Sequence, residues 1–208
     1  MSSQTCHTTG PARSAGGLWE YLSPSRLNTW LACPLKFRFR YVDRIASPAT
    51  PSLLVGKVVH AGLEALYRGR QEGTPLEPGA LIGRVRDCWN TIAAEDPVPF
   101  RDSAQEEKLR EQAVDLVMAY EGQLDENEPQ PMAIEQRYSA PLVDPETGEH
   151  LGIDLLGVVD LVLDPARPLI IDFKTAARSG QANEIVHEVQ LSSYAYLFRH
   201  CARRCEAA

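Results

Sequence analysis

With 208 residues and a mass of 23.0 kDa, the chain is long enough for one domain with a full hydrophobic core and too short for two large ones. Its content of 44% hydrophobic and 24% charged residues excludes a disordered protein and a coiled coil, and no apolar run approaches the ~18 residues that span a bilayer. The net charge of −7 excludes the uniformly basic surface of a simple nucleic-acid coating protein, although a local groove can still be positive.

The N-terminus lacks the basic-then-apolar order of a signal peptide, so we expect a cytoplasmic protein without membrane contact. Residues 1 to about 20 are rich in Ser, Thr and Gly without periodicity, which predicts a disordered tail before a single domain over 21–208. The cysteines are odd in number and lack disulfide-like spacing, which favours free thiols in a reducing compartment. They are Cys6, Cys33, Cys88, Cys201 and Cys205.

Helical patterns dominate the first half of the chain. One helix is predicted from Ser23, with Pro24 in its first turn, and Pro34 should kink or restart it. Four basic residues then lie close together: Lys36, Arg38, Arg40 and Arg44. A second helix over 52–70 places His60 and Glu64 one turn apart on one face.

Two further helices are expected before the composition changes. One covers about 79–94, and the next opens where Ser103 and Glu106 have capping-box spacing. After Pro131, residues 133–143, 151–163 and 169–175 read as strands, and 183–199 return to helical spacing. The sequence therefore predicts an α/β fold, in which a small central sheet is flanked by helices.

The last two strands bring charged side chains together. If Asp164 and Pro168 close the short loop between them, antiparallel pairing places Asp160 opposite Asp172, and Lys174 shares their face because side chains alternate along a strand. Opposed carboxylates repel unless a proton or cation lies between them. Carboxylate oxygens select Mg²⁺ or Mn²⁺, and a lysine beside them can orient or deprotonate a water.

Simpler interpretations of these residues stay open. Either aspartate could mark a strand end, with Lys174 as an ordinary ion-pair partner, and a slip of one residue in register would separate the aspartates. On sequence alone, His60 is more readily a helix histidine of the core. Glu64 and Glu135 could support the site from behind, but an exposed or capping role is about as plausible.

Several blocks in this order resemble the PD-(D/E)XK nuclease superfamily, specifically its RecB-type exonuclease branch. The matching blocks are Ser23–Leu27 with Cys33 and Pro34, Gly56–His60, Gly157–Asp160, Ile171–Thr175 and Gln190–Tyr194. The resemblance implies that His60, Asp160, Asp172 and the backbone carbonyl of Phe173 bind metal, and that Lys174 acts on the attacking water. It further implies that Gln190 and Tyr194 contact DNA or the active-site lysine, although their spacing also suits a helix that caps the core.

The chain departs from this family in two respects. Some relatives hold an iron-sulfur cluster, which needs four thiolates, but only Cys201 and Cys205 follow the last motif here, so we expect no cluster. The family core also continues into a final strand that this sequence lacks. There is no Gly-x4-Gly-Lys-Ser/Thr motif, so any unwinding would come from a helicase partner.

The sequence thus predicts Mg²⁺- or Mn²⁺-dependent hydrolysis of phosphodiester bonds, more readily as an exonuclease acting on DNA in recombination or repair. Two rival hypotheses belong to other classes. One is a catalytically weak DNA-binding module that holds DNA for a helicase, which a metal-dependent cleavage assay would separate. The other is a structural iron-sulfur domain, which visible absorption would reveal.

Overall fold

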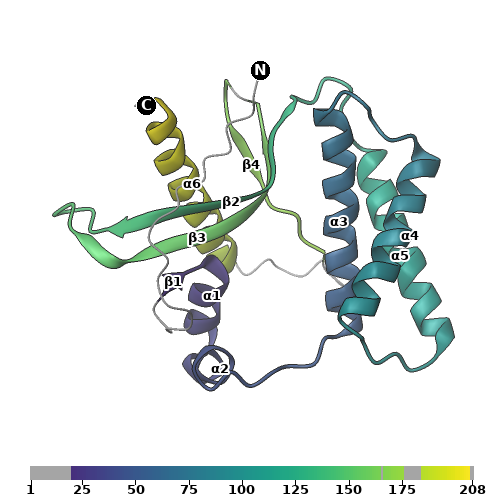
Figure 1. Cartoon of the computed structure of the whole chain (residues 1–208), viewed down its shortest axis with the longest axis horizontal. Coiled ribbons are helices and arrows are strands. Elements are labelled where there is room, and N and C mark those ends of the chain that lie inside the picture. Colours follow the sequence, from purple (N-terminus) through teal and green to yellow (C-terminus); the bar gives the residue numbers. More distant parts are fainter. Residues whose placement is uncertain (1–19, 165, 176–183, 207–208) are drawn as a thin grey trace.

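The computed structural model describes residues 20–164, 166–175 and 184–206, so nearly all of the predicted N-terminal tail lies outside it. A small mixed sheet lies between two groups of helices, which confirms the predicted fold class (Figure 1). The elements, in chain order, are β1 (Tyr21–Leu22), α1 (Pro24–Ala32), α2 (Pro34–Phe37), the π-helix η1 (Arg38–Val42), α3 (Pro51–Gln71), α4 (Pro78–Glu95), α5 (Ser103–Glu121), β2 (Pro131–Val143), β3 (His150–Leu163), β4 (Leu169–Ile171) and α6 (Glu184–Glu206). In the part of the chain that is described, no strand follows α6, and no helix is long and apolar enough to cross a membrane.

Side-chain caps define where the helices begin. Ser23 accepts a hydrogen bond from the backbone of Arg26 at the start of α1, and α2 restarts at Pro34 as predicted. α5 begins at Ser103 as predicted, but the capping role that the spacing of Ser103 and Glu106 implied is wrong. Asp102 holds that position with an extended backbone and accepts a 2.7 Å hydrogen bond from the nitrogen of Gln105, where a carboxylate also suits the positive end of the helix dipole.

The predicted register of the last two strands is confirmed. β3 pairs antiparallel with β4, with Leu161 opposite Ile171 and Val162 opposite Ile170. On its other edge β3 pairs antiparallel with β2 along most of its length. The two-residue strand β1 was not predicted, because a pair this short has no measurable period; it lies parallel to β3 at Asp154 and Leu155.

The prediction that the last strand continues to Thr175 is wrong, because β4 ends at Ile171. The backbone nitrogen of Phe173 donates a 2.7 Å hydrogen bond to the carboxylate of Asp160 instead of extending the ladder. Its carbonyl lies 3.0 Å from Nε2 of His60 on α3. The backbone nitrogen and carbonyl of Phe173, which a longer strand would use in its ladder, therefore bond to Asp160 of β3 and His60 of α3.

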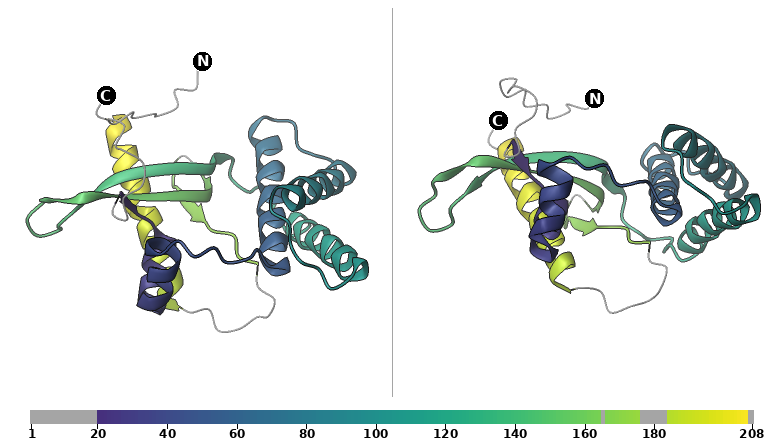
Figure 2. Two further views of the ribbon diagram at one scale, coloured as in Figure 1. Left: turned by 60° about the horizontal axis from the view of Figure 1, so that its bottom comes forward. Right: turned by 90° about the horizontal axis from the view of Figure 1, so that it is seen from below.

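Two apolar cores lie on opposite sides of the sheet. The larger one joins α3, α4 and α5 to Ile134, Leu161, Leu163 and Phe173, and the smaller one holds α6 against Ala140, Leu155 and Val159 (Figures 1 and 2). At Gly157 a β-carbon would come within 2.8 Å of Leu197. Glycine is therefore needed there for α6 to lie this close to β3.

Side-chain alternation along the β2 and β3 pair changes phase at one place. On β3, Leu155, Gly157 and Val159 face α6, but beyond Asp160 the residue that packs in the same core is Val162. Across the ladder, Glu135 stands between the paired residues Ile134 and Gln136 and has a φ of +46°. A positive φ in a residue with a side chain is strained, and such strain is concentrated at functional sites.

Candidate metal centre

His60 joins the helical part of the molecule to the sheet. It lies in the middle of α3, half-buried, and its Nε2 is 3.0 Å from the carbonyl oxygen of Phe173. A carbonyl only accepts, so Nε2 carries the proton and donates. In the neutral ring, Nδ1 then presents a lone pair on the side away from Phe173.

Two carboxylates face that lone pair. Nδ1 of His60 lies 3.8 Å from Oε1 of Glu135 and 3.7 Å from Oδ2 of Asp160, and the ligating atoms of the three residues all lie within 4.8 Å of one another. The two carboxylates come from the point on β2 and β3 where the alternation changes phase. One imidazole and two carboxylates form a donor set that suits a divalent cation.

Burial and neighbouring charge shift the proton affinities at this cluster. Burial raises the pKa of Asp160 to about 6, against the opposing effects of the Phe173 hydrogen bond and of His60. The pKa of His60 is raised above its usual value, chiefly by its interaction with Glu135, although burial acts in the opposite direction. Below about pH 6, a proton on Asp160 therefore reduces the negative charge of the cluster, and metal and protons compete for the same atoms.

A second group of polar residues adjoins the first. Asp172 follows β4, and its carboxylate is 2.6 Å from Nζ of Lys174 and accepts a 2.8 Å hydrogen bond from Nε2 of Gln190 on α6. The same Gln190 nitrogen lies 2.8 Å from the hydroxyl of Tyr194. Burial raises the pKa of Tyr194 to about 12, so its hydroxyl stays protonated.

Aromatic packing fixes the segment between these two groups. The ring of Phe173 is buried, stacks on Tyr67 at 6.1 Å and meets Tyr120 edge-on at 5.4 Å. The hydroxyls of Tyr67 and Tyr120 are 2.7 Å apart, and that of Tyr67 donates to Glu128. The peptide of Phe173, which touches both His60 and Asp160, is thus held in place from behind.

The structure brings together all the residues expected at the site, in a different arrangement. His60, Asp160 and Phe173 are in direct contact, whereas Asp172 contacts Lys174 and Gln190 and, among the described residues, is not in the group of close ligating atoms. Of the two glutamates with open roles, Glu64 pairs with Arg68 at 2.7 Å and Glu135 joins the cluster. The sequence signal for Glu135 was an acidic residue inside a predicted strand, but its position opposite Asp160 needed the register of β2.

The cysteines whose side chains the structure describes lie on or beside separate elements. Cys33 is exposed and its sulfur accepts from the backbone nitrogen of Lys36, while Cys88 lies on α4. The sulfur of Cys201 on α6 donates to the carbonyl of Ser139. Cys6 and the side chain of Cys205 lie outside the described residues.

His60→Ala is expected to weaken metal affinity by at least about 10-fold and to leave cleavage measurable at saturating Mn²⁺, because the carboxylates still supply ligands. Titration of Mn²⁺ by calorimetry checks this, with Glu64→Ala as a control one turn along the same helix. Unchanged metal dependence in His60→Ala would make His60 an ordinary core histidine.

Comparison with known proteins gives one match. A model of the PD-(D/E)XK nuclease superfamily matches residues 21–207, which is most of the chain and includes His60, Glu135, Asp160, Asp172 and Lys174. No curated protein and no solved structure matches the chain.

Proposed function

Because the chain belongs to the PD-(D/E)XK superfamily of metal-dependent nucleases, we propose that it is a Mg²⁺- or Mn²⁺-dependent deoxyribonuclease of the RecB-type branch. The reaction is hydrolysis of phosphodiester bonds, with attack at the ends of linear DNA. The observation that carries the proposal is the convergence of His60, Glu135 and Asp160, whose ligating atoms lie within 4.8 Å of one another. A role in recombination or repair beside a helicase partner follows from the same assignment.

The donor set fits the cation. Two carboxylates supply hard oxygen ligands and suit Mg²⁺, while the imidazole nitrogen is better accepted by Mn²⁺. The cluster is also strained and like-charged at neutral pH, with Glu135 at a positive φ and Asp160 largely buried. A divalent cation bound there would offset the negative charge of a phosphate and favour ionisation of a water.

Lys174 and Gln190 have roles that do not depend on holding the cation directly. Lys174 keeps 44% of its side chain exposed while its ammonium touches Asp172, so it can reach a water or a phosphate oxygen at the surface of the site. Asp172 is buried and orients that ammonium, and Gln190 fixes Asp172 by hydrogen bonding. Asp172 and the carbonyl of Phe173 are the remaining ligands of the proposed set.

The test is cleavage of end-labelled linear DNA and of covalently closed circular DNA in Mg²⁺, Mn²⁺ and Ca²⁺. We expect Mg²⁺ or Mn²⁺ to support release of short products from the linear substrate only, and Asp172→Asn to lose at least about 10²-fold in rate. Cleavage of the circular substrate would contradict the exonuclease assignment. Equal rates in the presence of a chelator, or in Asp172→Asn, would contradict the site.

A further inference from the structure

An exposed helical segment precedes α3. From the end of α1 through α2 and η1 to Ile45, most side chains point into solvent, although Phe37 is buried against Trp30 and Tyr41. The exposed apolar residues, each between 44% and 60% accessible, are Trp30, Leu31, Leu35, Phe39, Val42 and Ile45. Two of these six are aromatic, so the segment offers ring faces as well as aliphatic surface.

The charge of this segment opposes that of the rest of the chain. Lys36, Arg38, Arg40 and Arg44 are exposed, and the one acidic residue between Trp30 and Ile45 is Asp43, which pairs with Arg38 at 3.3 Å. Four cations against one anion on a chain of net charge −7 make this a local basic surface. An acidic protein that keeps such a surface separate from its carboxylate cluster is suited to a polyanion.

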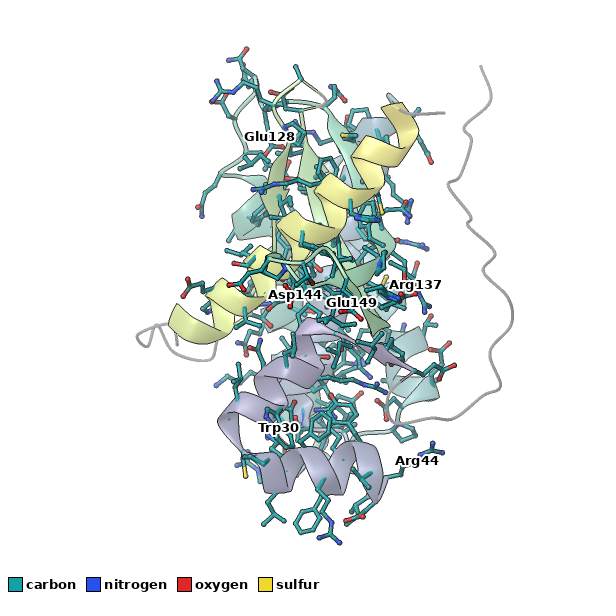
Figure 3. The ribbon with its side chains drawn as sticks, turned by 90° about the vertical axis from the view of Figure 1, so that its left-hand side faces the viewer. Trp30, Arg44, Glu128, Arg137, Asp144 and Glu149 are labelled. Atoms are coloured by element: carbon teal, nitrogen blue, oxygen red, sulfur yellow. The ribbon has the colours of Figure 1, made fainter. Side chains whose placement is uncertain are left out.

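The segment lies between the elements that carry the candidate site. α1 packs against α6, which bears Gln190 and Tyr194, and the chain leaving η1 runs directly to α3, which bears His60 (Figure 2). Figure 3 shows Trp30 and Arg44 on this segment, at the opposite end of that view from Glu128. α1 thus connects the segment to the helix whose Gln190 contacts Asp172.

We propose that the segment Trp30–Ile45 binds single-stranded DNA and guides it to the metal centre. Proteins that bind single strands combine cations for the backbone with aromatic rings on which bases stack. A duplex keeps its base faces covered, so it would use the cations but not the exposed ring of Phe39. The inference rests on the proposed nuclease function, because it gives that site a single-stranded substrate.

The test measures binding to a fluorescent oligothymidine of about 20 nucleotides, long enough to cover a site of the usual size. Ca²⁺ replaces the catalytic metal so that the strand stays intact, and the salt concentration is varied. The variants are Phe39→Ala and the double variant Lys36→Gln with Arg40→Gln. Matched controls lie at exposed positions on or beside α5. The double variant Arg101→Gln with Lys108→Gln repeats the charge changes, and Leu116→Ala removes an exposed apolar side chain that has no ring.

We expect Phe39→Ala to bind the oligonucleotide at least about 5-fold more weakly, as loss of one base-stacking ring does. The double charge variant should reduce the slope of log affinity against log salt by about 1.4, because each phosphate contact on a single strand contributes about 0.7. Variants that bind as their controls do, or a wild-type chain that binds no single strand, would overturn the inference. If the segment variants bind the oligonucleotide as the wild-type chain does, the exposed surface would instead be assigned to contact with a protein partner.

Cleavage by the wild-type chain, measured separately, distinguishes this inference from the proposed function. If the wild-type chain binds the oligonucleotide without cleaving DNA, and the segment variants lose that binding, the segment is a surface for single strands and the nuclease assignment is refuted. If the wild-type chain cleaves DNA and every variant binds the oligonucleotide normally, the nuclease assignment is supported and the binding surface is refuted. Circular dichroism of each variant excludes loss of fold as the cause of a binding defect.

Discussion

Lys174→Ala is expected to retain DNA and metal binding and to lose at least about 10²-fold in turnover, the usual effect of removing one acid-base or electrostatic group. Nζ of Lys174 lies 2.6 Å from the buried carboxylate of Asp172, while 44% of the side chain stays exposed. Asp172 therefore holds the ammonium at the edge of the site. Because 44% of the Lys174 side chain is exposed, a phosphate or an attacking water can reach it.

Single-turnover cleavage of linear DNA, with enzyme and metal saturating, measures this loss separately from binding. DNA affinity is measured in parallel in Ca²⁺. Lys174→Arg is the matched variant, and we expect it not to restore turnover, because a guanidinium stays protonated and is planar and bulkier. Near-normal turnover in Lys174→Ala would leave Lys174 with the simple role of neutralising Asp172.

Asp160→Asn is expected to abolish metal binding and cleavage and to stabilise the metal-free protein at neutral pH. Asp160 is 8% exposed and supplies one of the two carboxylates facing His60. An amide in its place can still accept the hydrogen bond from the nitrogen of Phe173. It cannot supply an anionic ligand, so the cation loses the more buried of the two carboxylates that face His60.

The stabilising effect has a defined pH range. The pKa of Asp160 is about 6 in the folded chain against 3.8 for an ordinary aspartate, so the folded state binds more protons than the unfolded state between these values. Folding stability therefore falls as pH rises from about 4 to about 6, by up to about 3 kcal/mol, and the loss is complete above that range. Asp160→Asn removes this loss.

Thermal unfolding without metal, followed from pH 4 to pH 8, tests the effect. We expect the variant and the wild-type chain to unfold at similar temperatures near pH 4, and the variant to be the more stable above pH 6. Added Mn²⁺ should then raise the unfolding temperature of the wild-type chain alone, because only that chain binds it. Stabilisation of both proteins by Mn²⁺ would show that Asp160 is dispensable as a ligand.

Local patterns in the sequence were sufficient to predict the hairpin and its register. A short polar loop at Asp164 between two apolar runs, combined with alternation of side chains, placed Val162 opposite Ile170 as observed. The α3 helix was likewise predicted within one residue at each end, because its apolar stripe spans the whole element. In both cases the pattern depends only on neighbours along the chain.

The details of the site depend on packing between distant elements, which no local pattern encodes. The left-handed backbone of Glu135 and the early end of β4 both arise where α3 meets the sheet. The cap at Asp102 was missed for a different reason, since two adjacent residues could each cap α5 and spacing alone favoured the wrong one. The pairing of Asp172 with Gln190 required the close approach of α6 at Gly157.

The short β4 strand places two uses of the same peptide groups in competition, hydrogen bonds of the sheet ladder and contacts with the candidate site. A strand that continued past Ile171 would gain ladder hydrogen bonds, but it would take the nitrogen and carbonyl of Phe173 away from Asp160 and His60. Selection for thermal stability alone would therefore favour changes that lengthen β4 and release both side chains from their present positions. With three residues, β4 still pairs with β3, and the peptide groups of Phe173 stay available to Asp160 and His60.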